Sequence, residues 1–402
     1  MLLQFSVNNF RSFRTTQSLS LVAGKGSELI ESNTFEISPS LRLARSAVIY
    51  GPNAGGKSNL IKAFHFFQQF ILHSATLYQE KQPIALYPFR LDPATSDHPS
   101  EFSIDFICDG THFNYQVAID KNKIVREELY AFPKKYRQAW FTRTWDASAN
   151  RYTWYYGPNF KGEHKAWEQM TRANALYLST AVQFNSEQLR PLFLWIRDQL
   201  VIVPRQAMFN PDLTFQCLKD TKSSTWIHKF MECADIGIEG FLLNEQDDPT
   251  GKKTAVLTAH KIGDSNQQTH FDLFQDESDG TQKLFLQAGG WFKSLQEGLV
   301  LCVDELDISL HAKIVRHLVT LFHDSKTNLK NGQLLFTTHD TSLLDADLFR
   351  RDQIWFLEKD NTQGSRLYSL LDFKPRKNEA LGKGYLQGRY GALPFPGKFC
   401  FV

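Results

Sequence analysis

The sequence has no long apolar run, few cysteines and almost no net charge. No stretch of about 18 apolar residues occurs, and Asn8, Asn9 and Arg11 lie where a signal peptide needs a continuous apolar segment. The five cysteines are far apart and form no CxxC pair, so neither a disulfide framework nor a zinc site is indicated. We therefore expect a cytoplasmic protein with reduced thiols and no membrane partner.

The charge balance excludes a bulk polycation. Across 402 residues, 45 Lys plus Arg face 43 Asp plus Glu, which leaves a formal charge of +2. With 42% hydrophobic and 13% aromatic residues the composition is that of a folded protein, and the length suggests two or three structural units. A surface balanced in this way suits protein partners, and any nucleic acid would have to bind a local basic patch.

Residues 1–185 are predicted to form an N-terminal lobe. Two early strands are indicated at Leu2–Val7 and Ser18–Val22, and a buried strand at 46–50 leads into a glycine-rich segment followed by apolar residues at helical spacing. From about residue 84 the pattern becomes an antiparallel meander. Its predicted strands are Phe102–Ile107, Phe113–Ile119 and Ile124–Tyr130.

The rest of the chain divides into two further regions. Residues 186–253 are predicted to be a mainly helical insertion or lid around one strand, Leu200–Val203. Residues 254–402 alternate strands and helices again, as in a second α/β lobe. The fold class expected is therefore α/β, with an antiparallel β subdomain and a mainly helical insertion.

The glycine-rich segment fits the P-loop pattern GxxxxGK[ST] at every fixed position. Its glycines allow a tight turn whose backbone N–H groups form an anion-binding nest at the positive end of the following helix. Lys57 is expected to reach the β- and γ-phosphates of ATP, and the Ser58 hydroxyl to ligate Mg²⁺. The eight residues of the pattern are Gly51, Pro52, Asn53, Ala54, Gly55, Gly56, Lys57 and Ser58.

Two later strand ends carry the groups that a phosphate-hydrolysing site needs. The apolar run 299–303 ends in Asp304 and Glu305, predicted respectively to hold Mg²⁺ through water and to polarise the attacking water. The next apolar strand, about 333–338, ends at His339, which at that position can contact the γ-phosphate and the hydrolytic water. Without the P-loop, the acid pair fits a solvated turn equally well.

The segment Glu277–Gln282 opens a predicted helix. Ser278, Gly280 and Thr281 at its start could form a second phosphate-binding nest, but Ser and Asp also make ordinary helix N-caps. A further segment, 134–172, mixes Trp and Tyr with Lys134, Arg137 and Arg143. This composition is compatible with stacking on nucleic-acid bases, although two more strands of the meander are the better-supported interpretation.

The order of these motifs resembles the ATP-binding-cassette head of the SMC, Rad50 and RecF type, with 278–282 resembling the signature of that family. The start also fits, since residues 8–13 read NNFRSF and the resemblance implies that Arg11 approaches the phosphates. More narrowly, the chain resembles the stand-alone bacterial ATPases of the RloA and AbiL type. The motifs that carry this likeness are NNFRSF, GPNAGGKSN (through Asn59), ESDGTQKLF, VDELDISLH, TTHDTSLLD and GRYGALP.

The resemblance also has departures. Leu310 is followed by His311 and then Ala312 at the position of the D-loop, and Gln183 is a candidate Q-loop residue only by resemblance. In such heads the signature lies too far from its own P-loop to contact the same γ-phosphate. The resemblance thus implies a homo-oligomer in which two copies enclose two ATP molecules, Ser278, Gly280 and Thr281 of one copy completing the site of the other.

Two functions from different classes follow from these observations. The first is an ATPase that acts as sensor or scaffold for a separate effector protein, encoded by an adjacent gene, in anti-phage defence of the abortive-infection kind. The alternative is a RecF-like or Rad50-like DNA-binding ATPase of DNA repair or recombination.

Overall fold

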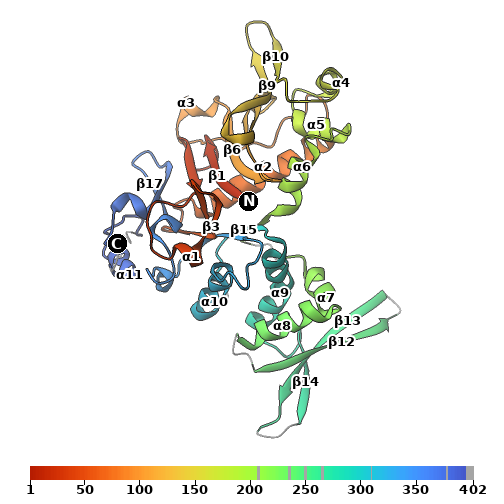
Figure 1. The fold of residues 1–402 in the computed structure, drawn as a ribbon, viewed down its shortest axis with the longest axis vertical. Coiled ribbons are helices and arrows are strands. Elements are labelled where there is room, and N and C mark those ends of the chain that lie inside the picture. The colour runs from red at the N-terminus through yellow and green to blue at the C-terminus, as the bar shows by residue number, and fades with distance from the viewer. Residues whose placement is uncertain are drawn as a thin grey trace, which may run out of the picture.

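The computed structural model describes residues 1–205, 209–233, 237–248, 251–263, 267–308, 310–376 and 379–394. Figure 1 shows an antiparallel sheet at the top, a second sheet at the centre, and an arm of helices and strands that projects at the bottom. The predicted α/β fold with an antiparallel β subdomain is confirmed. Among the residues that the structure describes, no helix has the length and hydropathy that crossing a membrane would need.

The central sheet brings together strands from distant parts of the chain. Five of its six strands run parallel, and the last one is antiparallel to its neighbour. The strand before the P-loop lies in the middle, between two strands from the last quarter of the chain. In spatial order the strands are β11 (Leu200–Val203), β15 (Val300–Val303), β16 (Gln333–Thr337), β5 (Ser46–Tyr50), β17 (Ile354–Lys359) and β18 (Ser365–Ser369).

Helices cover both faces of this sheet, which explains why its strands are apolar at almost every position. In β5, Ala47 and Ile49 belong to the core shared with α2 (Lys57–Leu77). Val48 and Tyr50 point into the other core, which includes apolar residues of two C-terminal helices. These helices are α9 (Asp279–Glu297) and α10 (Ala312–His323).

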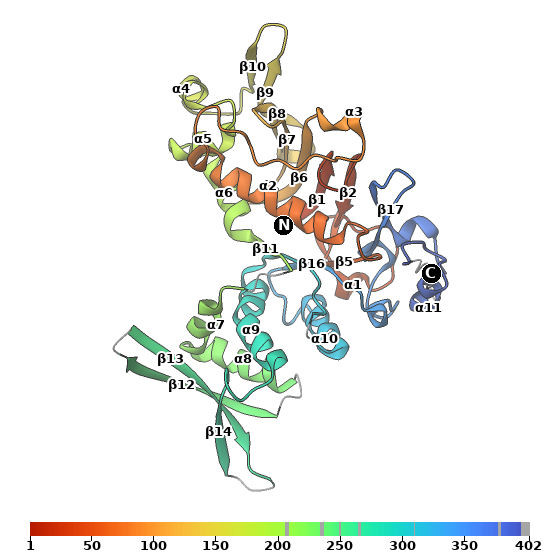
Figure 2. The ribbon, with the colours of Figure 1, turned by 180° about the vertical axis from the view of Figure 1, so that it is seen from behind.

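The second sheet is antiparallel and has seven strands. Its core face packs against α2, with Phe64 and Phe67 contacting strand residues such as Phe5 and Phe102. Helix α2 therefore lies between the two sheets, as Figure 2 shows. In spatial order the strands are β10 (Arg151–Tyr156), β9 (Gln138–Asp146), β8 (Ile124–Phe132), β7 (Thr111–Ile119), β6 (Ser100–Cys108), β1 (Leu2–Asn8) and β2 (Gln17–Ser20).

A glutamine side chain joins an inner strand of one sheet to an inner strand of the other. Gln333, at the start of β16, accepts a hydrogen bond from Leu2 N (2.7 Å) and donates one to Leu2 O (3.0 Å). Short elements surround the two sheets. They are β3 (Thr34–Ser38), β4 (Leu41–Ala44), α1 (Ile30–Asn33), α3 (Pro93–Ser96), α4 (His164–Met170), α5 (Tyr177–Gln183), α6 (Arg190–Leu194) and α11 (Leu381–Leu386).

The arm differs from the expected helical insertion. It begins with two helices, as predicted, but residues 238–248 form a strand that pairs with the next one. The expected boundary between residues 253 and 254 falls inside this hairpin, and the strand at 200–203 belongs to the central sheet. The arm consists of α7 (Pro211–Leu218), α8 (Thr221–Cys233), β12 (Ile238–Asp248), β13 (Gly251–Lys261) and β14 (Gln268–Asp272).

Candidate nucleotide-binding site

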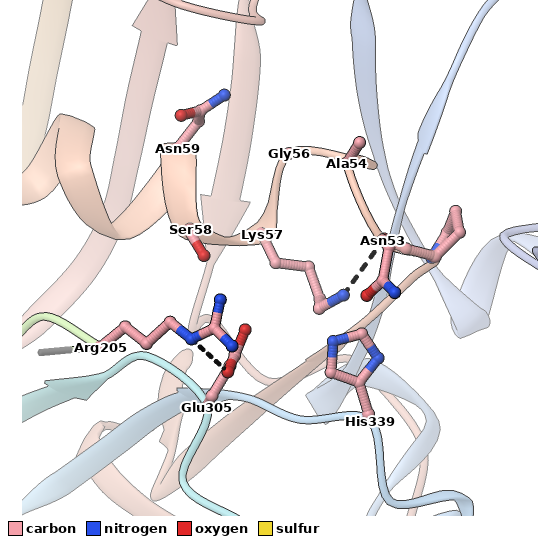
Figure 3. Close-up of a pocket in the computed structure, with 10 residues that line it drawn as sticks. Asn53, Ala54, Gly56, Lys57, Ser58, Asn59, Arg205, Glu305 and His339 are labelled. Atoms are coloured by element: carbon pink, nitrogen blue, oxygen red, sulfur yellow. Dashed lines mark hydrogen bonds and ion pairs between the residues drawn. The ribbon is translucent and has the colours of Figure 1, made fainter. Parts of the chain in front are cut away.

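A cavity of about 590 Å³ opens where α2 begins, at the carboxyl ends of the central strands. Parallel strands place the residues that follow them at one edge of a sheet, so segments far apart in sequence meet there. Figure 3 shows their side chains converging on one space. The cavity is lined by Pro52, Asn53, Ala54, Gly56, Lys57, Ser58, Asn59, Arg205, Glu305 and His339.

Two glycines of the P-loop have a structural reason to be glycine. Gly56 has φ +118°, and a Cβ there would lie 2.3 Å from Ser365 Oγ. A Cβ on Gly51 would lie 2.0 Å from Leu357 O. Because Gly56 provides no side-chain cap, the first N–H groups of α2 are left to an incoming anion.

Lys57 is the first residue of α2, and its ammonium group is folded back over the loop. Nζ donates hydrogen bonds to Gly51 O (2.7 Å) and Pro52 O (3.2 Å). Burial lowers the pKa of Lys57 to about 8, against the opposing effect of nearby carboxylates, of which Glu305 is the strongest. The amine is thus positioned to bind phosphate oxygens. Without them, the nearby carboxylates offset only part of the cost of burying its charge.

Asp304 and Glu305 follow β15 and share one hydroxyl group. Thr337 Oγ1, at the end of β16, donates to Asp304 Oδ1 (2.7 Å) and accepts from Glu305 N (2.7 Å). Asp304 is buried below the cavity, while Glu305 lines it. Glu305 adopts φ +53°, a left-handed conformation that is rare for a residue with a side chain and is enriched at functional sites.

His339 follows β16 and lines the cavity opposite Glu305, as Figure 3 shows. Its backbone N–H donates to Asp307 Oδ2 (3.3 Å), while Oδ1 of that aspartate is buried without a partner. Burial, followed by the charge of Lys57, lowers the pKa of His339. The neutral imidazole is therefore favoured at neutral pH, and its two ring nitrogens can donate one hydrogen bond and accept another.

The residues present fit Mg²⁺ as a companion of a bound phosphate. A serine hydroxyl and a carboxylate, Ser58 and Asp304, are the oxygen ligands that this ion prefers. Within the described residues there is no cluster of three acidic, His or Cys side chains that would hold a metal by themselves. Mg²⁺ usually binds through one or two protein oxygens, water and substrate phosphates.

The start of the chain contributes less directly than expected. The Arg11 guanidinium lies over the Tyr87 ring (4.5 Å), and Arg11 does not line the cavity. Its neighbour Ser12 accepts a hydrogen bond from Asn59 Nδ2 (2.9 Å). The segment thus supports the first turn of α2, whereas the direct phosphate contact of Arg11 stays a prediction.

The signature-like segment lies at the start of α9, away from the lining of this cavity. Ser278 caps the helix by accepting from Thr281 N (3.2 Å), so the N-cap interpretation is confirmed as local structure. Ser278 is exposed. The preceding Glu277 accepts hydrogen bonds from Thr258 Oγ1 and His260 Nε2 of β13, both at 2.6 Å, which joins the arm to this segment.

Two assignments made by resemblance are not brought to the cavity. Gln183 is exposed at the end of α5, which packs beside the antiparallel sheet, and it does not line the cavity. His311 serves as the N-cap of α10, with Nδ1 accepting from Lys313 N (3.2 Å). Between Glu305 and this cap, residue 309 lies outside the described residues.

The aromatic and basic segment 134–172 is mainly structural. Residues 138–146 and 151–156 are strands of the antiparallel sheet. Arg143 is fully buried beside Glu127, with Nη1 3.6 Å from Oε2, and donates to Ala175 O and Arg172 O. This arginine therefore cannot contact nucleic acid in the folded chain.

Arg205, which the sequence analysis missed, lies in the cavity. Its Nε is 2.8 Å from Oε2 of Glu305, and Figure 3 shows the two side chains facing each other. Local motif spacing gives no signal for this residue. The one usable signal is that it follows the predicted strand at 200–203, just as Glu305 follows the strand that ends at residue 303.

A family and two solved structures are similar to this chain. The SMC head domain from Thermotoga maritima is similar over most of the chain, with 12% identity and a TM-score of 0.43, and the match covers 92% of this chain and 98% of that one. An SMC head bound to the C-winged helix domain of ScpA is similar as well, with 13% identity and a TM-score of 0.44, and the match covers 92% of this chain and 97% of that one. No curated protein matches the chain. Residues 46–345 match a family described as "AAA domain, putative AbiEii toxin, Type IV TA system". This range contains the P-loop, the strand ends that carry Glu305 and His339, and the arm. The chain belongs to this family.

Proposed function

We propose that the chain binds ATP with Mg²⁺ and hydrolyses it to ADP and phosphate. The observation that carries this proposal is that Lys57, at the start of α2, and Glu305 and His339, after two neighbouring strands, point into the same cavity. Lys57 and the N–H groups of the loop bind the phosphates, Glu305 orients and deprotonates the attacking water, and His339 contacts the transferred group. Ser58 and Asp304 would hold Mg²⁺, which would neutralise charge on the phosphates.

In the same proposal, two copies close around ATP. Ser278, Gly280 and Thr281 do not line the P-loop cavity of their own chain, and Ser278 is exposed at the positive end of α9. A second copy could present the same segment to the γ-phosphate. ATP would then stabilise the dimer, and hydrolysis would remove the group that links the two copies.

Two substitutions test the ATPase proposal. Lys57→Ala should abolish ATP binding, because it removes the cation that faces the phosphates. Glu305→Gln should still bind ATP but hydrolyse it at least about 100-fold more slowly, and should persist as a dimer with ATP. Nucleotide titration, phosphate release and light scattering after size exclusion measure these effects. Hydrolysis by Glu305→Gln at the wild-type rate would contradict the assignment.

For the biological role we propose a sensor or scaffold that controls a separate effector protein in anti-phage defence, in the manner of the RloA and AbiL type. The family description, which includes a toxin–antitoxin system, supports a two-component arrangement. The test is co-purification of the chain with the product of an adjacent gene, with and without ATP. Salt-dependent DNA binding at physiological ionic strength, without such a partner, would instead favour the DNA-repair alternative.

A further inference from the structure

Arg205 reaches the cavity because of strand register. Strand β11 pairs in parallel with β15, with Val203 opposite Val303, and Asp304 N donates to Val203 O (3.0 Å). Two residues beyond the Val203–Val303 pair, the two strands place Arg205 and Glu305 at the same edge of the sheet. The contact between them is thus built into the central sheet.

The two side chains of this ion pair differ in solvent exposure. The Glu305 side chain is 11% exposed and its backbone is fixed by Thr337, whereas the Arg205 side chain is 61% exposed. An ion pair with one partner so exposed is weak, because water and salt screen it. A more highly charged anion can therefore displace Glu305 as the partner of the guanidinium.

A phosphate in the cavity would be such an anion. Of the described residues that line the cavity, Lys57 and Arg205 are the ones with a cationic side chain at neutral pH, and Lys57 is already held by two loop carbonyl groups. A guanidinium group matches phosphate oxygens in a bidentate manner, which an ammonium group cannot do. While Arg205 remains on Glu305, it also occupies carboxylate lone pairs that a water molecule would need.

We propose that Arg205 exchanges Glu305 for the γ-phosphate of ATP and thereby acts as a catalytic residue supplied by the same chain. This inference rests on the proposed ATPase function. In the reaction, water oxygen forms a bond to the γ-phosphorus as the bond to the bridging oxygen of ADP breaks, and one water proton passes to Glu305. Arg205 neutralises the charge on the γ-oxygens, and its departure leaves the Glu305 carboxylate able to orient the water.

The experiment compares Arg205→Ala and Arg205→Lys with the wild-type chain. Calorimetric titration with Mg-ATPγS and with Mg-ADP, together with steady-state phosphate release, gives the readouts. We expect Arg205→Ala to bind ATPγS about tenfold more weakly, to bind ADP within about twofold of wild type, and to lose about 100-fold or more in kcat. Arg205→Lys should recover part of the ATPγS affinity but less of kcat.

Arg197→Ala is the matched control. Arg197 also pairs with an adjacent acid, Asp198, at 2.8 Å and is similarly exposed, but it does not line the cavity. It should leave both nucleotide affinities and kcat unchanged.

Four results would separate the possibilities. Equal loss of ATPγS and ADP affinity in Arg205→Ala would overturn the inference, because it indicates only a general disturbance of the site. A rise in kcat would also overturn it, since Arg205 would then merely block Glu305. If the wild-type chain neither binds nor hydrolyses ATP, the proposed function itself fails; if it does both and Arg205→Ala matches it, only this inference fails.

Discussion

Two arginine–carboxylate pairs in this chain show opposite uses of the same chemistry. In the antiparallel sheet, Arg143 and Glu127 are both fully buried, and the carboxylate also accepts from Tyr115 Oη, Tyr177 N and Leu178 N. In the cavity, the Arg205–Glu305 pair is shorter, but the arginine is mostly exposed. Breaking the buried pair would leave a buried charge without a partner, so Arg143 stays with Glu127. Arg205 is mostly exposed and can leave Glu305 for another anion.

The largest effect is expected on breaking the buried pair. Arg143→Leu leaves the Glu127 carboxylate buried without its cation, which should lower the free energy of unfolding by about 3–5 kcal/mol. Chemical denaturation measures this loss. The double variant Glu127→Leu with Arg143→Leu should recover part of it, because no buried charge then remains. A loss below about 1 kcal/mol in the single variant would show that the pair is not what holds this sheet together.

An intermediate effect is expected from Lys57, whose cation has only carbonyl groups as hydrogen-bond partners in the free chain. With its pKa lowered to about 8, Lys57 loses its proton as the pH rises from 7 to 9, while bound phosphates favour the protonated form. ATP affinity should therefore fall roughly tenfold over this range, and binding near pH 8.5 should take up protons. Calorimetry in two buffers of different ionisation enthalpy measures both.

Lys57→Arg is the control for this pH dependence, since a guanidinium stays charged throughout the range. Whatever ATP affinity this variant retains should be almost independent of pH. An equally steep decline in Lys57→Arg would place the titrating group elsewhere.

The smallest effect is expected on the stability of the nucleotide-free chain when the cavity pair is removed. Arg205→Ala should change the free energy of unfolding by less than about 1 kcal/mol, because the arginine is mostly exposed. Urea denaturation without nucleotide tests this. A loss as large as that of Arg143→Leu would mean that the cavity pair is a structural pair and would erase the contrast between the two.

The sequence was informative wherever a function depends on local spacing. The P-loop, Asp304, Glu305 and His339 each follow an apolar strand, and parallel strands bring such positions to one edge. Arg205 escaped prediction because its place depends on which strand pairs with β15, a non-local fact. Arg143 was a candidate for nucleic acid because an arginine between aromatic residues looks the same whether the strand face is exposed or buried.

The arm shows a different limit. The sequence pattern places residues 238–248 in a mainly helical region, yet they pair along their length with β13. Strand formation here depends on the partner strand and on packing against α9, as in the contact of Phe241 with Phe285, whose ring centroids lie 4.8 Å apart. The boundary placed at 253/254 divides a hairpin for the same reason.

The position of β5 in the central sheet also bears on the synthesis of the protein. The strand that presents the P-loop pairs on one side with β16 and on the other with β17, and Gln333 clamps the first strand of the chain. On the ribosome, residues 46–50 emerge some 300 residues before these partners. In a nascent chain, the strand that carries the phosphate-binding loop therefore gains its first neighbour only when β16 has been made and its second only with β17, so we expect the loop to reach its final conformation late in synthesis.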